Sequence, residues 1–209
     1  MSAAPSVPAG DNEVATLFER RAASVDELAG HAGTVAAACH DMAIRFHQGG
    51  KLVVFGTGAS STDALHVAVE FVHPVIVGKR ALPAISLTAD TATVTGIAER
   101  EGMGAIFAHQ IRHLATPADI ALGLSADGNS ESVLNGLLTA NGMGMLTIAL
   151  AGGGGGVIGS SPAVDHILVT TQSDPRVVKE VQVTAYHVLW ELVHVFFEQP
   201  GVLGPAVVS

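Results

Sequence analysis

Apolar residues recur at two different spacings along this chain, and each spacing predicts a type of element. Between Asp11 and Gln48, and again over residues 176–198, apolar residues return every three or four positions, which is the period of one helix face. Gly30 and Gly33 interrupt the first stretch, so it predicts two antiparallel helices at the start of the fold. The last stretch predicts one long helix.

Short apolar runs of a second kind predict buried strands, and they fall at residues 51–55, 84–87, 120–124, 145–150 and 166–169. Helical patterns separate them at residues 61–72, 91–99, 105–114 and 130–140. Strands that alternate with helices form a parallel sheet with helices on both faces. The predicted fold class is therefore α/β, a three-layer αβα sandwich.

Composition narrows the function classes. Hydrophobic residues make up 48% of the 209 residues and charged residues only 14%, so we expect copies of the chain to associate through apolar surface. The net charge of −9 and the lack of Lys/Arg clusters argue against nucleic-acid binding. The single cysteine, Cys39, cannot form an internal disulfide and is expected to fill the core.

The length suits one domain, which we place at residues 11–200. Residues 1–10 and 201–209 are expected to be tails, the first of them disordered. Residues 1–10 are rich in Ala, Pro and Ser and lack the basic and apolar regions of a signal peptide. No apolar stretch is clean enough to span a membrane, so we expect a cytoplasmic protein with no membrane partner.

Histidine and glutamate recur with one spacing on two predicted helices. The pattern His-x-x-x-Glu-x-x-His occurs twice in a chain with ten histidines, at His66, Glu70 and His73 and at His187, Glu191 and His194. Positions four apart share a helix face, so each pair can direct an imidazole and a carboxylate at one volume. The pattern indicates acid-base chemistry, a metal, or both. Di-iron helical bundles also use Glu-x-x-His, but the predicted strands argue against a bundle.

Three turns follow predicted strands, where ligands of open parallel sheets bind. Residues 56–61 and 125–130 offer hydroxyl groups at helix starts, which suit an anion. The first turn lacks the lysine of a P-loop and the third glycine of a dinucleotide fingerprint, so no nucleotide cofactor is expected. The third turn, residues 152–156, is five glycines and predicts a floppy surface loop.

Four segments, residues 56–60, 63–70, 82–88 and 125–130, follow one another as in the sugar isomerase (SIS) domain family. The chain most resembles the phosphoheptose isomerase branch, over residues 51–192. The resemblance implies a five-stranded parallel sheet between helices and two leading helices. It also implies a homotetramer with sites at subunit interfaces, and isomerisation of sedoheptulose 7-phosphate.

The same resemblance implies roles for individual residues. Glu70 corresponds to the family's acid/base glutamate and His187 to its histidine partner, and these converge from neighbouring subunits in the family fold. Its zinc-binding branch implies that His66, Glu70 and His187 hold one divalent metal, with zinc the first choice. Lys179 stands where that branch has a glutamine ligand.

Several positions of the implied sugar-phosphate site depart from the family pattern. Thr57 replaces an asparagine, Glu99 and Arg100 replace Asn-Asp, and Asp127 replaces a serine of the phosphate cradle. A carboxylate there would repel a phosphate unless Arg100 or Lys179 compensates. The candidate substrate-binding residues are Thr57, Gly58, Ser60, Arg100, Ser125, Asp127, Ser130 and Lys179.

Three hypotheses follow from these residues. The first is a sugar-phosphate isomerase with Glu70 and His187 as its acid/base pair. The second is a non-catalytic SIS protein that senses a sugar phosphate or binds another protein, and the third is a metal-binding SIS derivative. Glu70 and His187 favour the first, whereas Asp127, Glu99-Arg100 and Lys179 favour the others. His73, Glu191 and His194 have no family role and are expected on a solvated or interfacial face.

Overall fold

The computed structural model describes residues 10–199 and 201–203. Most of the two expected tails, 1–9 and 204–209, therefore lies outside the described residues. All five predicted strands form, as β1 (Leu52–Gly56), β2 (Ala84–Ser86), β3 (Ile120–Ser125), β4 (Leu146–Ala151) and β5 (His166–Val169). They pair in parallel in the order β2-β1-β3-β4-β5. The α/β fold class with a five-stranded parallel sheet is confirmed.

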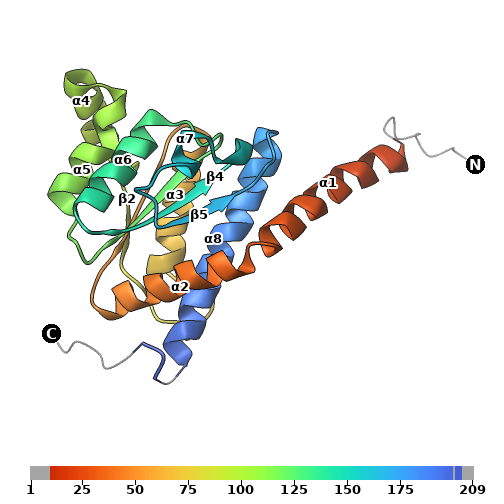
Figure 1. Cartoon of the computed structure of the whole chain (residues 1–209), viewed down its shortest axis with the longest axis horizontal. Helices are drawn as coiled ribbons and strands as arrows, with labels where there is room; N and C mark the ends of the chain where they lie inside the picture. Colours follow the sequence, from red (N-terminus) through yellow and green to blue (C-terminus); the bar gives the residue numbers. More distant parts are fainter. Residues whose placement is uncertain (1–9, 200, 204–209) are drawn as a thin grey trace, which may run out of the picture.

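Helices cover both faces of this sheet (Figure 1). The longer ones are α1 (Asp11–Ala29), α2 (Ala32–His47), α3 (Ala59–Val72), α4 (Thr91–Glu101), α5 (Ile106–Leu114), α6 (Glu131–Gly142) and α8 (Pro175–Glu198). One hydrophobic core lies under α2, α3 and α8, and a second lies under α5 and α6. None of the described helices is long and apolar enough to cross a membrane.

The central strand β1 is buried on both faces, which explains why its sequence is an unbroken run of apolar residues. Leu52 and Val54 belong to the core under α2, α3 and α8, whereas Val53 and Phe55 belong to the core on the opposite face. Successive side chains of a strand point to opposite faces, so a strand buried on both sides must be apolar throughout. Cys39 is also fully buried, and burial raises the pKa of its thiol to about 12, which confirms its expected place in the core.

The two leading helices form, but they are not antiparallel as expected. α1 runs into α2 in roughly the same direction, and its N-terminal end reaches away from the body of the molecule (Figure 1). Both helices lie along α8 instead of against each other. The backbone at Gly30 keeps a right-handed helical conformation, with φ −61° and ψ −20°, so the break between the helices does not reverse the chain.

The five-glycine segment is packed into the fold, which corrects the expectation of a floppy surface loop. Residues Gly153–Gly155 form a 3-10 turn, and Gly156–Gly159 form the short helix α7. The N–H of Gly153 donates to the carbonyl of Gln172 at 2.9 Å, and the N–H of Gly154 donates to that of Thr170 at 3.1 Å. Glycine is required here because four successive residues, 153–156, have positive φ.

Glycine also lets this segment touch the turn after β3. A Cβ atom on Gly128, whose φ is +71°, would lie 2.0 Å from the carbonyl oxygen of Gly155. A Cβ atom on Gly152 would lie 2.2 Å from the carbonyl oxygen of Ala126. The two turns therefore interlock by backbone contact.

This interlock predicts a large effect for one methyl group. Gly128→Ala should lower the free energy of unfolding by about 2 kcal/mol or more, because the substitution combines a positive φ with a backbone clash. Gly33→Ala is the matched control, since Gly33 lies in α2 and a methyl group added there would meet no heavy atom within 4 Å. It should raise stability by roughly 0.5–1 kcal/mol. Urea unfolding measures both, and equal stabilities would contradict the interlock.

Candidate functional site

The strand order places a ligand site at one edge of the sheet. The order reverses between β1 and β3, and ligands of such sheets bind in the crevice outside the carboxyl ends of the strands at that point. The turns after β1 and β3 meet there. Thr57 Oγ1 lies 3.2 Å from Ser130 Oγ, which in turn lies 3.2 Å from Ser132 Oγ. These hydroxyls stand at the N-termini of α3 and α6, where the helix dipole favours an anion.

A pocket of about 220 Å³ borders this turn. Thr57, Ser61 and Thr88 contribute hydroxyl groups to its lining. Val94, Met103, Ile106 and Phe107 add apolar side chains to its lining. Such a pocket suits a molecule with both hydroxyl groups and a carbon skeleton, as sugars have.

The predicted histidines and glutamate meet between α3 and α8. His66 and Glu70 come from α3 and His187 from α8, and one ligand atom of each lies within 4.8 Å of the others. Glu70 is only 8% exposed, and its Oε1 lies 3.1 Å from His66 Nε2. The rings of His66 and His187 stand 5.3 Å apart. All three belong to one chain, so the expectation that Glu70 and His187 meet from neighbouring subunits is wrong.

The second half of each histidine-glutamate motif does not join this site. His73 and Glu191 are exposed, as expected. His194 is 2% exposed, which contradicts the expected solvated or interfacial face. Its Nδ1 lies 2.8 Å from the carbonyl of Trp190 and its Nε2 lies 2.9 Å from that of Arg80, so it joins α8 to the chain after α3.

His187 is oriented by its own helix. Its Nδ1 lies 2.8 Å from the carbonyl oxygen of Val183, which can only accept a hydrogen bond. In the neutral ring the proton therefore sits on Nδ1, and Nε2 keeps its lone pair. This arrangement suits both a proton acceptor and a metal ligand.

Tyr186 is a residue of this site that the sequence analysis missed. Its hydroxyl lies 2.7 Å from His66 Nδ1, and its ring packs against that of His187 with centroids 4.8 Å apart. Tyr186 is 1% exposed. Burial, followed by the negative charges of Asp63 and Glu70, raises the pKa of its phenol, which therefore keeps its proton.

Lys179 pairs with Asp63 and not with Asp127, the carboxylate whose charge it was expected to compensate. Its Nζ lies 2.6 Å from Oδ1 of the buried Asp63, and it also donates to Thr62 Oγ1 at 3.2 Å. Arg100 is exposed on α4 and donates from Nε to the carbonyl of Gly96 in the same helix. Among the described contacts, neither cation reaches Asp127.

Asp127 is stabilised by its own turn instead. Its Oδ1 accepts a hydrogen bond from the N–H of Asn129 at 2.9 Å and one from the hydroxyl of Ser125 at 3.3 Å. An aspartate that bonds the backbone two residues on forms an Asx turn. The carboxylate therefore occupies donors of this turn that an anionic ligand would otherwise meet.

Comparisons with known proteins agree with this geometry. A model of the SIS domain family matches residues 18–152. The chain is 37% identical to a phosphoheptose isomerase of Solidesulfovibrio magneticus, over 90% of this chain and 91% of that protein. It is 36% identical to one of Aquifex aeolicus, over 78% and 80%.

Solved structures give the same result. A phosphoheptose isomerase from Neisseria gonorrhoeae superposes with a TM-score of 0.79 at 26% identity, covering 87% of this chain and 97% of that one. One from Francisella tularensis gives 0.78 at 28% identity, covering 88% and 98%. The chain thus belongs to the SIS-domain family and, within it, to the phosphoheptose isomerases.

Proposed function

We propose that the protein is an aldose-ketose isomerase that acts on a sugar phosphate, with sedoheptulose 7-phosphate as the first candidate. The observation that carries this proposal is the meeting of buried Glu70 with His187 in one chain. Relatives named phosphoheptose isomerase, at 36–39% identity, support it.

Aldose-ketose isomerisation moves a proton between adjacent carbons through an enediol, so it needs two positioned groups. Glu70 takes the proton from one carbon and returns it to the other. His187 exchanges a proton with the neighbouring sugar oxygen through Nε2. His66 holds Glu70 Oε1 at 3.1 Å, which leaves the second carboxylate oxygen for the substrate.

The phosphate group is proposed to bind where the turns after β1 and β3 meet. Thr57, Gly58 and Ser60 supply this site from the start of α3, and Ser125 and Ser130 supply it from the turn after β3. Arg100, Asp127 and Lys179 complete the proposed substrate-binding set, although the described contacts engage them elsewhere. The sugar chain would then extend toward the histidine-glutamate site between α3 and α8.

The donor set also fits one divalent metal, with zinc the first choice. Two imidazole nitrogens and one carboxylate oxygen, from His66, His187 and Glu70, are typical of zinc sites, and three protein ligands leave a position open. A metal held there would polarise a sugar oxygen as a Lewis acid. Lys179 is engaged with Asp63, so the set has three protein ligands rather than four.

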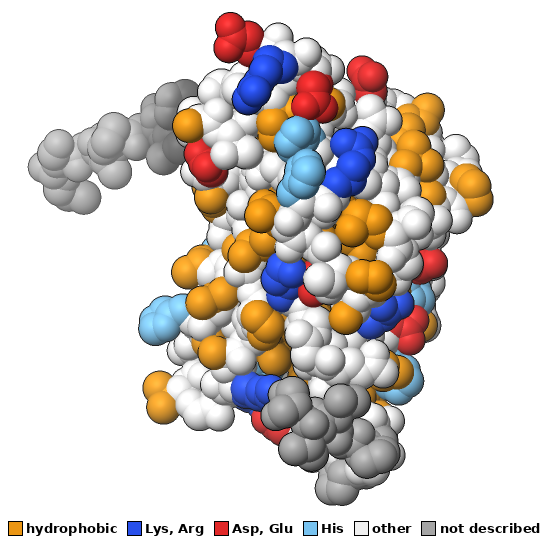
Figure 2. All heavy atoms as spheres, turned by 90° about the vertical axis from the view of Figure 1, so that its left-hand side faces the viewer, with side chains coloured by type: hydrophobic (Ala, Val, Ile, Leu, Met, Phe, Trp, Pro, Cys, Tyr) orange, Lys and Arg blue, Asp and Glu red, His pale blue; other side chains and the backbone are white. Residues whose placement is uncertain are grey.

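We also propose that the protein is a homo-oligomer, and that a second copy covers α1. Val14, Leu17 and Phe18 on this helix are 44%, 49% and 69% exposed. Figure 2 shows the side of the molecule away from α1, where hydrophobic side chains are interspersed with Lys, Arg, Asp, Glu and His side chains. An apolar helix face without a partner contributes little stability on its own, so a second chain is its natural cover.

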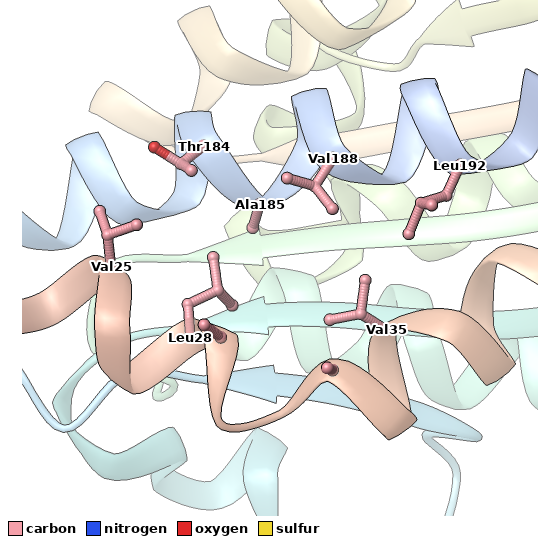
Figure 3. Close-up of a pocket in the computed structure, with 9 residues that line it drawn as sticks. Val25, Leu28, Val35, Thr184, Ala185, Val188 and Leu192 are labelled. Atoms are coloured by element: carbon pink, nitrogen blue, oxygen red, sulfur yellow. The ribbon is translucent and has the colours of Figure 1, made fainter.

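An apolar groove continues from this helix face. It has a volume of about 240 Å³ and lies between the α1-α2 segment and α8 (Figure 3). Its lining is almost wholly apolar and comprises Val25, Leu28, Ala29, Ala32, Val35, Thr184, Ala185, Val188 and Leu192. Val25 belongs to α1, so the groove and the exposed face of α1 form one surface for a second copy.

The proposed activity is tested by comparing substitutions at the site with the same type of substitution at a glutamate outside it. Glu70→Gln and His187→Ala should each lower turnover of sedoheptulose 7-phosphate at least about 100-fold, because each removes a proton-transfer group. Glu191→Gln is the control, since Glu191 is an exposed glutamate one turn beyond His187 on the same helix. It should leave turnover unchanged. A wild-type protein inactive on heptose and pentose phosphates would remove the isomerase proposal.

The phosphate site is tested at Asp127. Asp127→Asn removes only the charge, whereas Asp127→Ser also returns a hydroxyl group, and both keep an acceptor for the N–H of Asn129. If repulsion weakens phosphate binding, both variants should bind the substrate several-fold more tightly in calorimetry. Unchanged affinity in both would mean that the phosphate does not approach this turn, and would contradict the proposed phosphate site.

The oligomer is tested by mass. Light scattering should give at least a dimer at micromolar concentration, with a tetramer expected from the family. Phe18→Asp should reduce that mass, because it places a charge on the most exposed apolar side chain of α1. Glu13→Asp, on the same helix, should leave it unchanged. A monomer in the wild type would contradict the proposal.

A further inference from the structure

We propose that Tyr186 is a positioning residue that holds His66 with its Nε2 toward Glu70. Its effect on catalysis rests on the function proposed above, whereas its effect on His66 does not. Tyr186 is the only tyrosine in the chain and directly precedes His187. It lies on the long helix α8 and contacts both His66 and His187.

The hydroxyl of Tyr186 contacts the imidazole of His66. The ring is 1% exposed and stands edge-on to His66, with an interplanar angle of 87° and centroids 5.5 Å apart. Its hydroxyl lies 2.7 Å from His66 Nδ1. On the other side of the imidazole, Nε2 lies 3.1 Å from Glu70 Oε1. Phenol, imidazole and carboxylate thus form a continuous chain of hydrogen bonds.

The direction of this chain follows from the end groups. An ionised carboxylate has no proton and can only accept, so His66 Nε2 must carry the proton that faces Glu70. In the neutral ring Nδ1 is then an acceptor, and the Tyr186 O–H donates to it. The hydroxyl therefore selects one of the two ring tautomers.

Without this hydrogen bond, nothing else among the described contacts orients His66 Nδ1. The His66 side chain is 42% exposed, so water can reach the ring and it can turn. Glu70 would then lose a fixed partner for Oε1. A hydroxyl also serves a metal-binding ring, since it can accept from an Nδ1–H when Nε2 gives up its proton.

Tyr186→Phe isolates this role, because phenylalanine fills the same buried space and lacks only the hydroxyl. The matched control is Thr147→Val, which removes a buried hydroxyl bonded to the carbonyl of Ala163 at 2.8 Å, away from the site. Both variants lose a buried hydroxyl, so a general loss of stability appears in both. An effect confined to Tyr186→Phe is specific to His66.

The first measurement is nitrogen-15 NMR of the histidine rings in the metal-free full chain. The His66 signals are assigned by their loss in His66→Ala. In the wild type and in Thr147→Val, we expect a single tautomer with the proton on Nε2. In Tyr186→Phe we expect a mixture of the two tautomers.

The second measurement is zinc affinity by competition with a chromogenic chelator. Loss of a group that orients a histidine ligand costs about 10- to 100-fold in metal affinity, so Tyr186→Phe should bind zinc that much more weakly. Thr147→Val should match the wild type. Turnover of sedoheptulose 7-phosphate should fall in kcat with little change in KM, because the hydroxyl orients Glu70 through His66 and does not bind the sugar.

The outcomes separate the two proposals. An unchanged His66 tautomer in Tyr186→Phe overturns the positioning role, whatever the activity. Equal losses of zinc affinity in both variants also overturn it, since the effect would then be structural. If the tautomer changes in Tyr186→Phe but the wild type has no isomerase activity, the role of Tyr186 is supported and the isomerase proposal is contradicted.

Discussion

Polar side chains between two neighbouring helices determine where the site forms. Polar contacts join α8 to α3 along their lengths, among them Lys179 with Asp63, Tyr186 with His66, and the Trp190 indole with the carbonyl of Glu70. A shift of α8 by one turn would leave several of these groups without a partner. Each buried polar group left unpaired costs about 1–3 kcal/mol, so such a shift is unfavourable. The contacts thus fix the register of the two helices. That register brings His187 to Glu70.

The same helix connects this site to the turns that face the proposed phosphate. Buried Gln182 on α8 donates from Nε2 to the carbonyl of Ser125 at 2.9 Å and to that of Leu150 at 3.1 Å. These carbonyls lie near the carboxyl ends of β3 and β4, where the interlocked glycine turns begin. These hydrogen bonds and the backbone contacts of the glycine turns therefore join the hydroxyl groups of one turn to the helix that carries His187, one of the residues proposed for proton transfer.

The sequence predicted what depends on local pattern and missed what depends on distant partners. The strands were located to within one or two residues because β1, β3 and β4 are buried along their whole lengths and are therefore mostly apolar. Gly30 marked a helix break but carried no information on chain direction, and five glycines indicated freedom where the fold uses positive φ. Tyr186 gave no signal, since its partner His66 lies 120 positions away. The repeated motif suggested a site role for His194, but its two ring nitrogens contact the backbone carbonyls of Trp190 and Arg80 instead.

Asp127 shows how one end of the site can change without disturbing the other. Its charge is satisfied by donors of its own turn, the N–H of Asn129 and the hydroxyl of Ser125, so the backbone there needs no external cation. An aspartate at this position is therefore compatible with a stable turn. Glu70 and His187 are held by α3 and α8 instead, and none of their described contacts involves this turn. In the proposed mechanism, selection of the anion and transfer of the proton are consequently separable, because a change at Asp127 leaves the contacts that hold Glu70 and His187 intact.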